Sequence, residues 1–213
     1  MKTLVAVPCM DMVHAIFMRS VLNMEKVGET DVELLSGSLV YDARNELLKK
    51  AIDEEYDQIL WLDSDMYFDA DVLQKLSADL TDGRDMVCGL YFGRKQPVTP
   101  VVYKDCGVYN LAGKELSPMA VPYWDYPEDK VFQIEACGFG GVLMSMDGVK
   151  RTVARFGERL FMPVAGFGED LSFCLRWKEA GGQIWCDSGV RIAHVGLYAY
   201  TEKDYLEARR EHI

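Results

Sequence analysis

Two aspartates, Asp63 and Asp65, stand one residue apart directly after the apolar run Ile59-Leu60-Trp61-Leu62. The run predicts a buried strand, and the carboxyl ends of buried parallel strands form the sheet edge at which ligands bind. Two carboxylates at this spacing can hold a divalent cation with one side chain and order a sugar or ribose hydroxyl with the other. The alternative interpretation is that both acids only cap the following helix.

Closely spaced aspartates also occur in other kinds of metal-binding and catalytic motif. An EF-hand loop would need an oxygen-bearing side chain at Tyr67 and a glycine at Phe68, so the sequence excludes it. A phosphatase of the haloacid dehalogenase type also places such a pair after an apolar strand, with the first aspartate as nucleophile. It usually does so near the start of the chain, with Thr or Val where Tyr67 stands. A metal-dependent phosphohydrolase or nucleotidyltransferase therefore stays open as an alternative function.

The chain up to Leu90 alternates between strand-like and helix-like segments. We expect strands at 4–7, 32–35, 58–62 and 86–90, and helices at 14–26, 41–54 and about 70–80. Asp69 or Asp71 is suited to cap the third helix. This βαβα rhythm predicts an α/β fold with a Rossmann-like, mostly parallel sheet flanked by helices.

The alternation ends after Leu90. Residues 93–130 hold five of the seven prolines and predict hairpins and long loops over the sheet, where substrate selectivity often resides. Beyond them we expect strands at 131–134, 140–145, 184–186 and 190–193, a helix at 171–180 closed by Gly181-Gly182, and a helical tail at 201–213. The chain is expected to form one domain, with a nucleotide-binding half at about 1–92 and an acceptor-side half at about 93–200.

Three further side chains could take part in chemistry. Arg44 lies near the start of a predicted helix, Asp170 follows Glu169 near the start of another, and His194 ends a short strand. Each has an ordinary structural alternative, namely a solvated arginine, a helix cap and a structural histidine. In addition, the glycine-rich turn at 137–141 would let the backbone pass close to a ligand.

The order of these features resembles glycosyltransferase family 2 and related GT-A enzymes. The matching motifs are an A-R-N helix start at Ala43-Arg44-Asn45, the D-x-D at the strand end, a G-x-x-E-D segment at Gly166-Phe167-Gly168-Glu169-Asp170, and a late histidine. The resemblance covers most of residues 1–196 and is strongest at 38–68 and 137–196. Each motif is short, so the specificity comes from their order.

The resemblance implies a single GT-A domain that moves a sugar from a nucleotide-diphosphate donor, such as a UDP-sugar, to an acceptor hydroxyl, with inversion favoured over retention. It implies that Mn2+ or Mg2+ binds Asp65 and His194, with Asp63 at the same site. Arg44 would hold the nucleotide, and Asp170, beside Glu169, would be the general base. The donor site would also include Pro8, Cys9, Asp63, Ser64, Gly138, Phe139 and Gly140. A non-catalytic carbohydrate-binding module descended from a transferase is a second alternative.

Composition restricts the partners and the location. The net charge of -11 and the pI of about 4.8 argue against a broad basic surface for nucleic acid. An acidic protein that binds a diphosphate needs a basic pocket or a bridging metal ion. The six cysteines lie far apart and predict buried thiols rather than a zinc site. The first apolar run is too short for a signal core or a membrane span, so we expect a cytoplasmic protein. The acceptor stays open among saccharide, lipid, protein, small molecule and modified nucleic acid.

Overall fold

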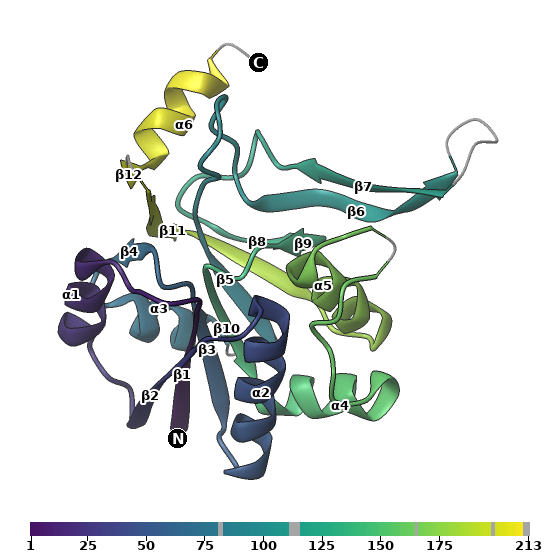
Figure 1. Ribbon diagram of the computed structural model, residues 1–213. Helices are drawn as coiled ribbons and strands as arrows, with labels where there is room; N and C mark the ends of the chain where they lie inside the picture. The colour runs from purple at the N-terminus through teal and green to yellow at the C-terminus, as the bar shows by residue number, and fades with distance from the viewer. Residues whose placement is uncertain (81–82, 111–115, 165, 197–198, 211–213) are drawn as a thin grey trace.

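The structure is a computed structural model that describes residues 1–80, 83–110, 116–164, 166–196 and 199–210. A mixed sheet flanked by helices forms the body of one α/β domain (Figure 1). In chain order the elements are β1 (Lys2–Cys9), α1 (Ala15–Asn23), β2 (Glu29–Ser36), α2 (Val40–Asp53), β3 (Gln58–Leu62), β4 (Met66–Phe68), α3 (Val72–Asp79), β5 (Met86–Leu90), β6 (Val102–Asn110), β7 (Leu116–Pro122), β8 (Val131–Ile134), β9 (Ala136–Cys137), β10 (Gly141–Ser145), α4 (Met146–Phe156), α5 (Glu169–Glu179), β11 (Ile184–Val195), β12 (Ala199–Tyr200) and α6 (Glu202–Arg209).

The main sheet has the strand order β12-β11-β5-β10-β3-β1-β2. Strand β1 is parallel to both β2 and β3, and β11 is parallel to β5. Strand β10 lies between β3 and β5 and is antiparallel to both, so β2, β1, β3, β5 and β11 all point the same way. Strands β4 and β8 pair with β11 off this path. The mostly parallel sheet expected from the sequence is confirmed, with a reversed strand near its middle.

The central strands are buried on both faces, because helices cover each side of the sheet. Every residue of β3 and β5 is buried. Along β1, Leu4 and Ala6 pack with α2, α4 and α5, whereas Val5 and Val7 pack with α1 and α3. Fully burying each large apolar side chain stabilises the fold by about 1.5–3 kcal/mol. The sheet is therefore a rigid support for residues at its carboxyl edge.

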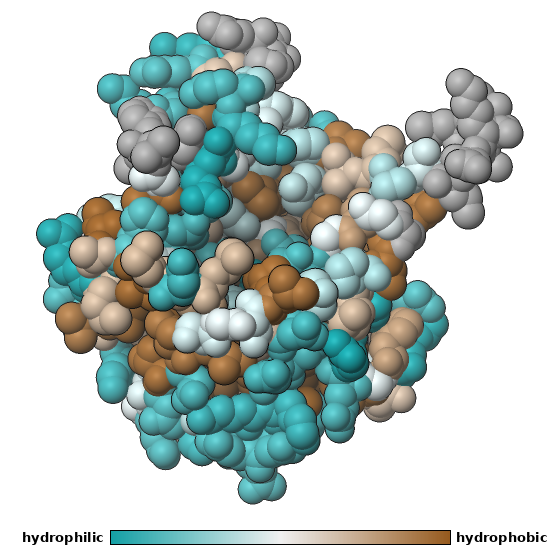
Figure 2. Space-filling model, in the orientation of Figure 1, coloured by the Kyte–Doolittle hydropathy of each residue, from teal (hydrophilic) through white to brown (hydrophobic). Residues whose placement is uncertain are grey.

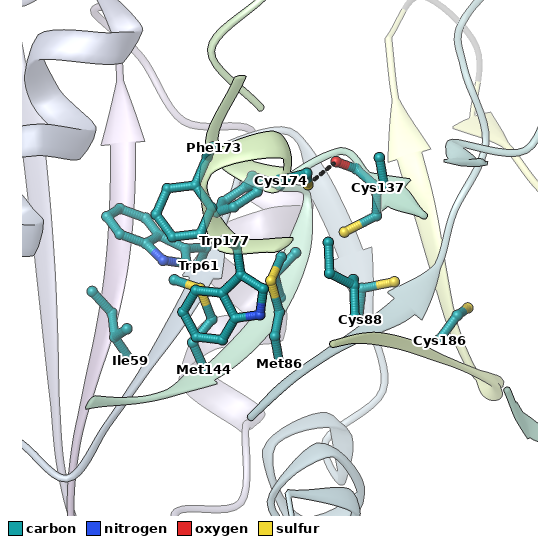
Figure 3. Packing of buried hydrophobic residues seen from close by; sticks show 14 of the residues in the cluster. Ile59, Trp61, Met86, Cys88, Cys137, Met144, Phe173, Cys174, Trp177 and Cys186 are labelled. Carbon is teal, nitrogen blue, oxygen red and sulfur yellow. Dashed lines mark hydrogen bonds between the residues drawn. The ribbon is translucent and has the colours of Figure 1, made fainter. Parts of the chain in front are cut away.

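Four cysteines, Cys88, Cys137, Cys174 and Cys186, lie in the same hydrophobic core cluster (Figure 3). All six cysteines of the chain are buried and none forms a disulfide. The Cys174 thiol donates to the carbonyl oxygen of Cys137 at 3.5 Å. The expectation of buried, unpaired thiols is confirmed.

Strands β6 and β7 form a long hairpin that extends away from the main sheet (Figure 1). Its strand β6 also pairs with β9, which makes a separate three-stranded sheet of order β7-β6-β9. This confirms the hairpin expected within residues 93–130, although residues 111–115, between the two strands in the sequence, lie outside the described part. None of the described helices combines the length and the hydropathy needed to cross a bilayer.

Several elements differ from the sequence expectations, among them α4, β4 and β11. The sequence pattern does not predict α4, whose interior Gly148 lowers helix propensity. A Cβ at Gly148 would come within 2.4 Å of the Trp177 ring, so the packing of α4 on α5 requires glycine there. Strand β4 is too short to show a period. The two short strands expected at 184–186 and 190–193 form a single strand, β11, whose pairing with β5 shifts register between Asp187 and Arg191.

The helix caps also differ in part. Asp71 occupies the N-cap position of α3, but its side chain makes no capping hydrogen bond and pairs with Lys75 at 2.8 Å. The prediction that Asp69 or Asp71 caps this helix is confirmed in position by Asp71, although the Asp71 carboxylate pairs with Lys75 instead of a backbone N–H. At the other end of the chain, α6 begins with a capping box between Thr201 and Asp204. The expected helical tail is confirmed to residue 209, and residues 211–213 lie outside the described part.

Candidate active site

A cavity of about 380 Å³ opens at the edge of the sheet where β1, β3, β5 and β11 end. Its volume lies in the range typical of small-ligand sites. Nine of the twelve site residues predicted from the sequence line it: Pro8, Cys9, Arg44, Asp63, Ser64, Asp65, Glu169, Asp170 and His194. The carboxyl edge of the sheet thus gathers side chains that are up to 186 positions apart in the chain, from Pro8 to His194.

The rim of the cavity is partly apolar. Met10 and Val40 both line the cavity and are exposed, Met10 by 74%. On the face shown in Figure 2, apolar side chains gather over the part of the molecule that contains α1, β1 and β2. Within residues 10–40, the large apolar side chains with at least a third of their surface exposed are Met10, Met12, Met18, Leu22, Val32, Leu34, Leu39 and Val40. An apolar rim therefore borders an interior lined by acids.

The segment Asp63-Ser64-Asp65 is a turn between β3 and β4. The Met66 N–H donates to the carbonyl oxygen of Asp63 at 3.1 Å. The Val195 N–H donates to the carbonyl oxygen of Asp65 at 2.7 Å, which ties the turn to the end of β11. Because β4 follows at once, neither aspartate stands at a helix N-terminus. The interpretation of this pair as helix caps is wrong.

Arg44 lies at the centre of an acidic cluster. Its Nη2 is 2.8 Å from Oδ1 of Asp63 and 3.5 Å from Oδ1 of Asp170, and its Nε is 3.9 Å from Oε1 of Glu169. Only 1% of the Arg44 side chain is exposed, so the alternative of a solvated arginine is wrong. The guanidinium is held by acids of this chain, which favours a role in positioning them. Direct contact with the nucleotide stays a prediction.

An aromatic wall surrounds the Arg44 guanidinium. Its Cζ lies 5.7 Å from the ring centre of Trp61, 5.1 Å from that of Phe139 and 5.6 Å from that of Phe161. Within the described residues, Nε and Nη1 of Arg44 have no hydrogen-bond acceptor. Burying these two N–H groups without an acceptor costs free energy. The attraction between a ring face and a desolvated cation, about 2 kcal/mol, offsets part of that cost. The cation is thus enclosed by rings on one side and by carboxylates on the other.

Asp170 is the second residue of α5, and it does not cap that helix. The N-cap residue is Gly168, and no side-chain capping hydrogen bond is formed. Oδ2 of Asp170 instead accepts from the Phe139 N–H at 3.3 Å. The side chain is 28% exposed and lines the cavity. The interpretation of Asp170 as a simple cap is therefore wrong, and its carboxylate can reach a bound ligand.

Burial changes the acidity of this cluster. It raises the pKa of Asp170 to about 7, with further increases from the charges of Glu169 and Asp63, while Arg44 acts in the opposite direction. Burial also raises the pKa of Asp63, again against the effect of Arg44. For Arg44 burial alone would lower the pKa, but the charges of the three acids outweigh it and raise the pKa. A carboxyl group with a pKa near neutrality is suited to general acid–base work.

Asp65 faces a different set of partners. Its Oδ2 is 3.3 Å from Nε2 of His194 and 2.8 Å from Nη1 of Arg94. On the other side of the imidazole ring, Nδ1 is 3.1 Å from the carbonyl oxygen of Phe92. Burial by itself would raise the pKa of Asp65, but the hydrogen bond and charge of His194 and the charge of Arg94 lower it below its usual value. The lowered pKa keeps this carboxylate ionised beside the Arg94 guanidinium.

The geometry of Asp65 and His194 fits a divalent cation. Because the Phe92 oxygen can only accept, Nδ1 of His194 must donate to it, and Nε2 of the neutral ring then carries a lone pair directed at the Asp65 carboxylate. A proton or a metal ion is needed between these two acceptors. Imidazole nitrogen with carboxylate oxygen is a suitable ligand set for Mn2+. Asp63 lines the same cavity with its Oδ1 held by Arg44, and its role as a further metal ligand stays a prediction. No cluster of three or more His, Cys, Asp or Glu metal ligands occurs among the described residues.

The glycine-rich turn lies behind the cavity rather than on its surface. Phe139 is fully buried, and neither Gly138 nor Gly140 lines the cavity. A Cβ on Gly138 would come within 1.9 Å of the Tyr91 hydroxyl, and one on Gly140 within 2.4 Å of Cε of Met66. Glycine is therefore required by the packing of protein side chains. That this turn borders the ligand stays a prediction, and in the structure the Phe139 N–H donates to Oδ2 of Asp170 at 3.3 Å.

Six residues of the cavity wall are not predicted from the sequence: Met10, Ser38, Val40, Tyr91, Arg94 and Val101. Tyr91 directly follows β5, so the rule that ligands bind at the carboxyl edge of the sheet could have found it. Arg94 and Val101 lie in a segment without a motif. Only the fold brings them beside the D-x-D turn.

The strand order and the cavity define a GT-A type α/β fold, and comparisons with known proteins agree. No family model matches the chain, and no curated protein matches it. The chain is similar to the crystal structure of A197 from STIV, with 19% identity, a TM-score of 0.71, and coverage of 96% of this chain and 92% of that chain. It is also similar to the crystal structure of GalNAc-T7 with UDP, GalNAc and Mn2+, with 12% identity and a TM-score of 0.59. That match covers 98% of this chain and 47% of GalNAc-T7, so the chain spans about half its length. At these identities the likeness shows the fold.

Proposed function

We propose that this chain is a metal-dependent glycosyltransferase that moves a sugar from a nucleotide-diphosphate donor, a UDP-sugar, to an acceptor hydroxyl. The observation that carries the proposal is the presence of two unlike sites in one cavity: Asp65 with His194, and Asp170 beside Arg44. The GT-A fold supports it, as does the structure of GalNAc-T7 with UDP, GalNAc and Mn2+.

The donor would bind at the D-x-D turn. Asp65 and His194 would hold Mn2+ or Mg2+, which would neutralise the charge on the departing diphosphate when bound. Asp63, whose carboxylate is oriented by Arg44 at 2.8 Å, would accept a hydrogen bond from a ribose or sugar hydroxyl. The cavity is lined by four acids against two arginines, so a dianionic diphosphate needs an added cation to bind there.

Asp170 would be the general base. It would take the proton of the acceptor hydroxyl while that oxygen attacks the anomeric carbon and the bond from this carbon to the diphosphate oxygen breaks. Phe139 and Arg44 hold its carboxylate at 3.3 Å and 3.5 Å, which fixes the direction from which the proton is taken. A direct displacement of this kind inverts the configuration at the anomeric carbon. Glu169 would help to keep the pKa of its neighbour high.

A panel of nucleotide sugars incubated with the purified protein and Mn2+ tests this proposal, with free nucleotide as the readout. We expect release of UDP from a UDP-sugar, dependent on Mn2+ and faster with an acceptor. A phosphohydrolase or nucleotidyltransferase would instead release phosphate or pyrophosphate without an acceptor. A carbohydrate-binding module would bind ligand without turning it over. Either result would overturn the proposal.

We also propose a cytoplasmic location and an acceptor that approaches from the side of residues 93–200. The six unpaired cysteines support the first, because a reducing compartment keeps thiols free. Val101 and α5 on the cavity wall support the second. Cell fractionation followed by thiol labelling tests the location, and recovery of the protein with oxidised cysteines in an extracellular fraction would contradict it.

A further inference from the structure

Arg94 lies in the cavity but has no role in the mechanism above. It follows β5 by four residues, and its Nη1 is 2.8 Å from Oδ2 of Asp65. The same oxygen is 3.3 Å from Nε2 of His194. Nη1 of Arg94 also donates to the carbonyl oxygen of Val195 at 3.1 Å. The guanidinium thus contacts the oxygen that a metal ion would bind.

A guanidinium and a divalent ion compete for this oxygen. Each is positive, and like charges a few ångströms apart repel each other in a partly buried site. Asp65 is only 19% exposed, so water screens that repulsion incompletely. Binding of a metal ion to Asp65 and His194 therefore favours release of Arg94.

Arg94 is able to leave, in contrast to Arg44. Its side chain is 45% exposed, against 1% for Arg44. Its contacts are a carboxylate shared with His194 and a main-chain carbonyl, and the rings that enclose Arg44 have no counterpart among the cation–ring contacts of the described residues. Moving Arg94 into solvent costs less than moving Arg44 would, because its guanidinium is already partly hydrated.

A donor diphosphate would give the released guanidinium a new partner. The planar fork of arginine matches the paired oxygens of a phosphate group and binds them with two hydrogen bonds. A diphosphate carried by a metal ion on Asp65 would lie within the same part of the cavity that Arg94 lines. Arginine is therefore better suited than lysine to bind the Asp65 carboxylate first and the donor diphosphate afterwards.

We propose that Arg94 neutralises Asp65 in the donor-free protein and moves to the diphosphate when the metal ion and the nucleoside diphosphate bind. This inference rests on the proposed function, because it needs a diphosphate in the cavity. It makes Arg94 a donor-binding residue that also competes with the metal ion. The donor-free protein then binds metal weakly, and metal and donor bind together.

The test compares Arg94→Gln with Lys95→Gln, which removes the same charge at the next position, outside the cavity wall. Isothermal titration measures the affinity of the donor-free protein for Mn2+, and then the affinity for UDP at saturating Mn2+. For Arg94→Gln we expect Mn2+ affinity to rise about tenfold and UDP affinity to fall about tenfold, the size expected for a hydrogen bond to a charged group. Lys95→Gln should match the wild type in both titrations. Arg94→Lys, which keeps the charge, should retain the wild-type Mn2+ affinity.

The outcomes separate this inference from the proposed function. If the wild type binds neither Mn2+ nor UDP, the proposed function fails and this inference fails with it. If the wild type binds both, an unchanged Mn2+ affinity in Arg94→Gln overturns the competition, and an unchanged UDP affinity overturns the transfer to the diphosphate. Arg94→Lys behaving like Arg94→Gln in the Mn2+ titration would also overturn the role of charge. Thermal melting of each metal-free variant shows whether the fold is intact.

Discussion

The two sides of the cavity hold their carboxylates in different ways. On one side, Asp63, Glu169 and Asp170 surround Arg44, a cation that belongs to the chain and is 1% exposed. On the other side, Asp65 faces Arg94, which is 45% exposed, and His194. The cation of the first side is fixed and enclosed in aromatic rings. The cation of the second side, Arg94, is reached by solvent.

This difference corresponds to what each side would do in a transferase. A general base must keep one direction and one pKa through every turnover, so a buried cation and a backbone N–H suit it. A metal and diphosphate site must gain and lose charge in every cycle, so its partners must be exchangeable. Substituting one residue of one side at a time shows whether that residue contributes to the free energy of unfolding, to the rate of transfer or to binding affinity.

The largest effect is expected from Arg44→Met. It leaves three carboxylates without their buried cation, and breaking a buried ion pair costs about 3–5 kcal/mol. Urea unfolding measures the free energy of unfolding. The matched control is Arg159→Met, which removes an arginine that is 64% exposed and 2.8 Å from Asp42. The control should lose under about 1 kcal/mol. Equal losses in the two variants would show that the Arg44 cluster is not a fixed support.

Asp170→Asn should impair the chemical step and spare the fold. An amide keeps the size of the side chain but cannot take a proton, so transfer to the acceptor should fall about a hundredfold or more. The rate of UDP release with acceptor and the melting temperature are measured on the same sample. Asp147→Asn, in the first turn of α4 and exposed, is the control and should retain activity. Normal turnover in Asp170→Asn would remove the base from the mechanism.

The pH dependence sharpens the same side of the comparison. Because the pKa of Asp170 is about 7, transfer should fall about tenfold for each pH unit below about 7, as the base is protonated. In the unfolded chain its pKa is about 4, so the folded state holds the extra proton between about pH 4 and pH 7. The contribution of Asp170 to the free energy of unfolding therefore falls as pH rises through that window. Asp170→Asn should lack this fall, and melting curves at pH 5 and pH 8 check it. A wild type and variant with parallel stability profiles would contradict the raised pKa.

A smaller effect is expected from His194→Ala on the exchangeable side. Loss of the imidazole should weaken Mn2+ binding about tenfold and leave the metal-free melting temperature nearly level. Titration with Mn2+ and a metal-free melting curve are recorded on the same variant. His14→Ala, an exposed histidine outside the cavity, is the control. A lower melting temperature with unaltered Mn2+ affinity would make His194 a structural histidine.

Much of the fold could be predicted because its signals are local. Strands β3, β5 and β8 occupy the expected residues, since each is a short apolar run between turn residues. Helix α4 could not be predicted in this way, because Gly148 is chosen by the ring of Trp177, a contact that no local pattern contains. The same limit applies to β4, whose three residues form a strand only by pairing with β11.

The cavity was predictable where strand ends alone define it, and not where distant side chains do. The D-x-D turn, Glu169, Asp170 and His194 reach the cavity because each lies at the start or the end of an element that could be recognised. The enclosure of Arg44 depends on Trp61, Phe139 and Phe161, which come from three separate segments. At Gly138 and Gly140 the sequence shows a requirement for glycine but not which neighbours impose it, and these are the side chains of Tyr91 and Met66. Arg94 carries no motif at all.

The central claim is that the cavity binds a nucleoside diphosphate through a metal ion on Asp65. Isothermal titration of UDP into the protein, with Mn2+ and then with chelator, tests it most directly. We predict that removing Mn2+ weakens UDP binding by about a hundredfold, that Asp65→Asn binds UDP equally weakly with and without Mn2+, and that Asp69→Asn, an exposed aspartate outside the cavity, behaves like the wild type. UDP affinity that is the same in the wild type and Asp65→Asn, and unaffected by the chelator, would contradict the account.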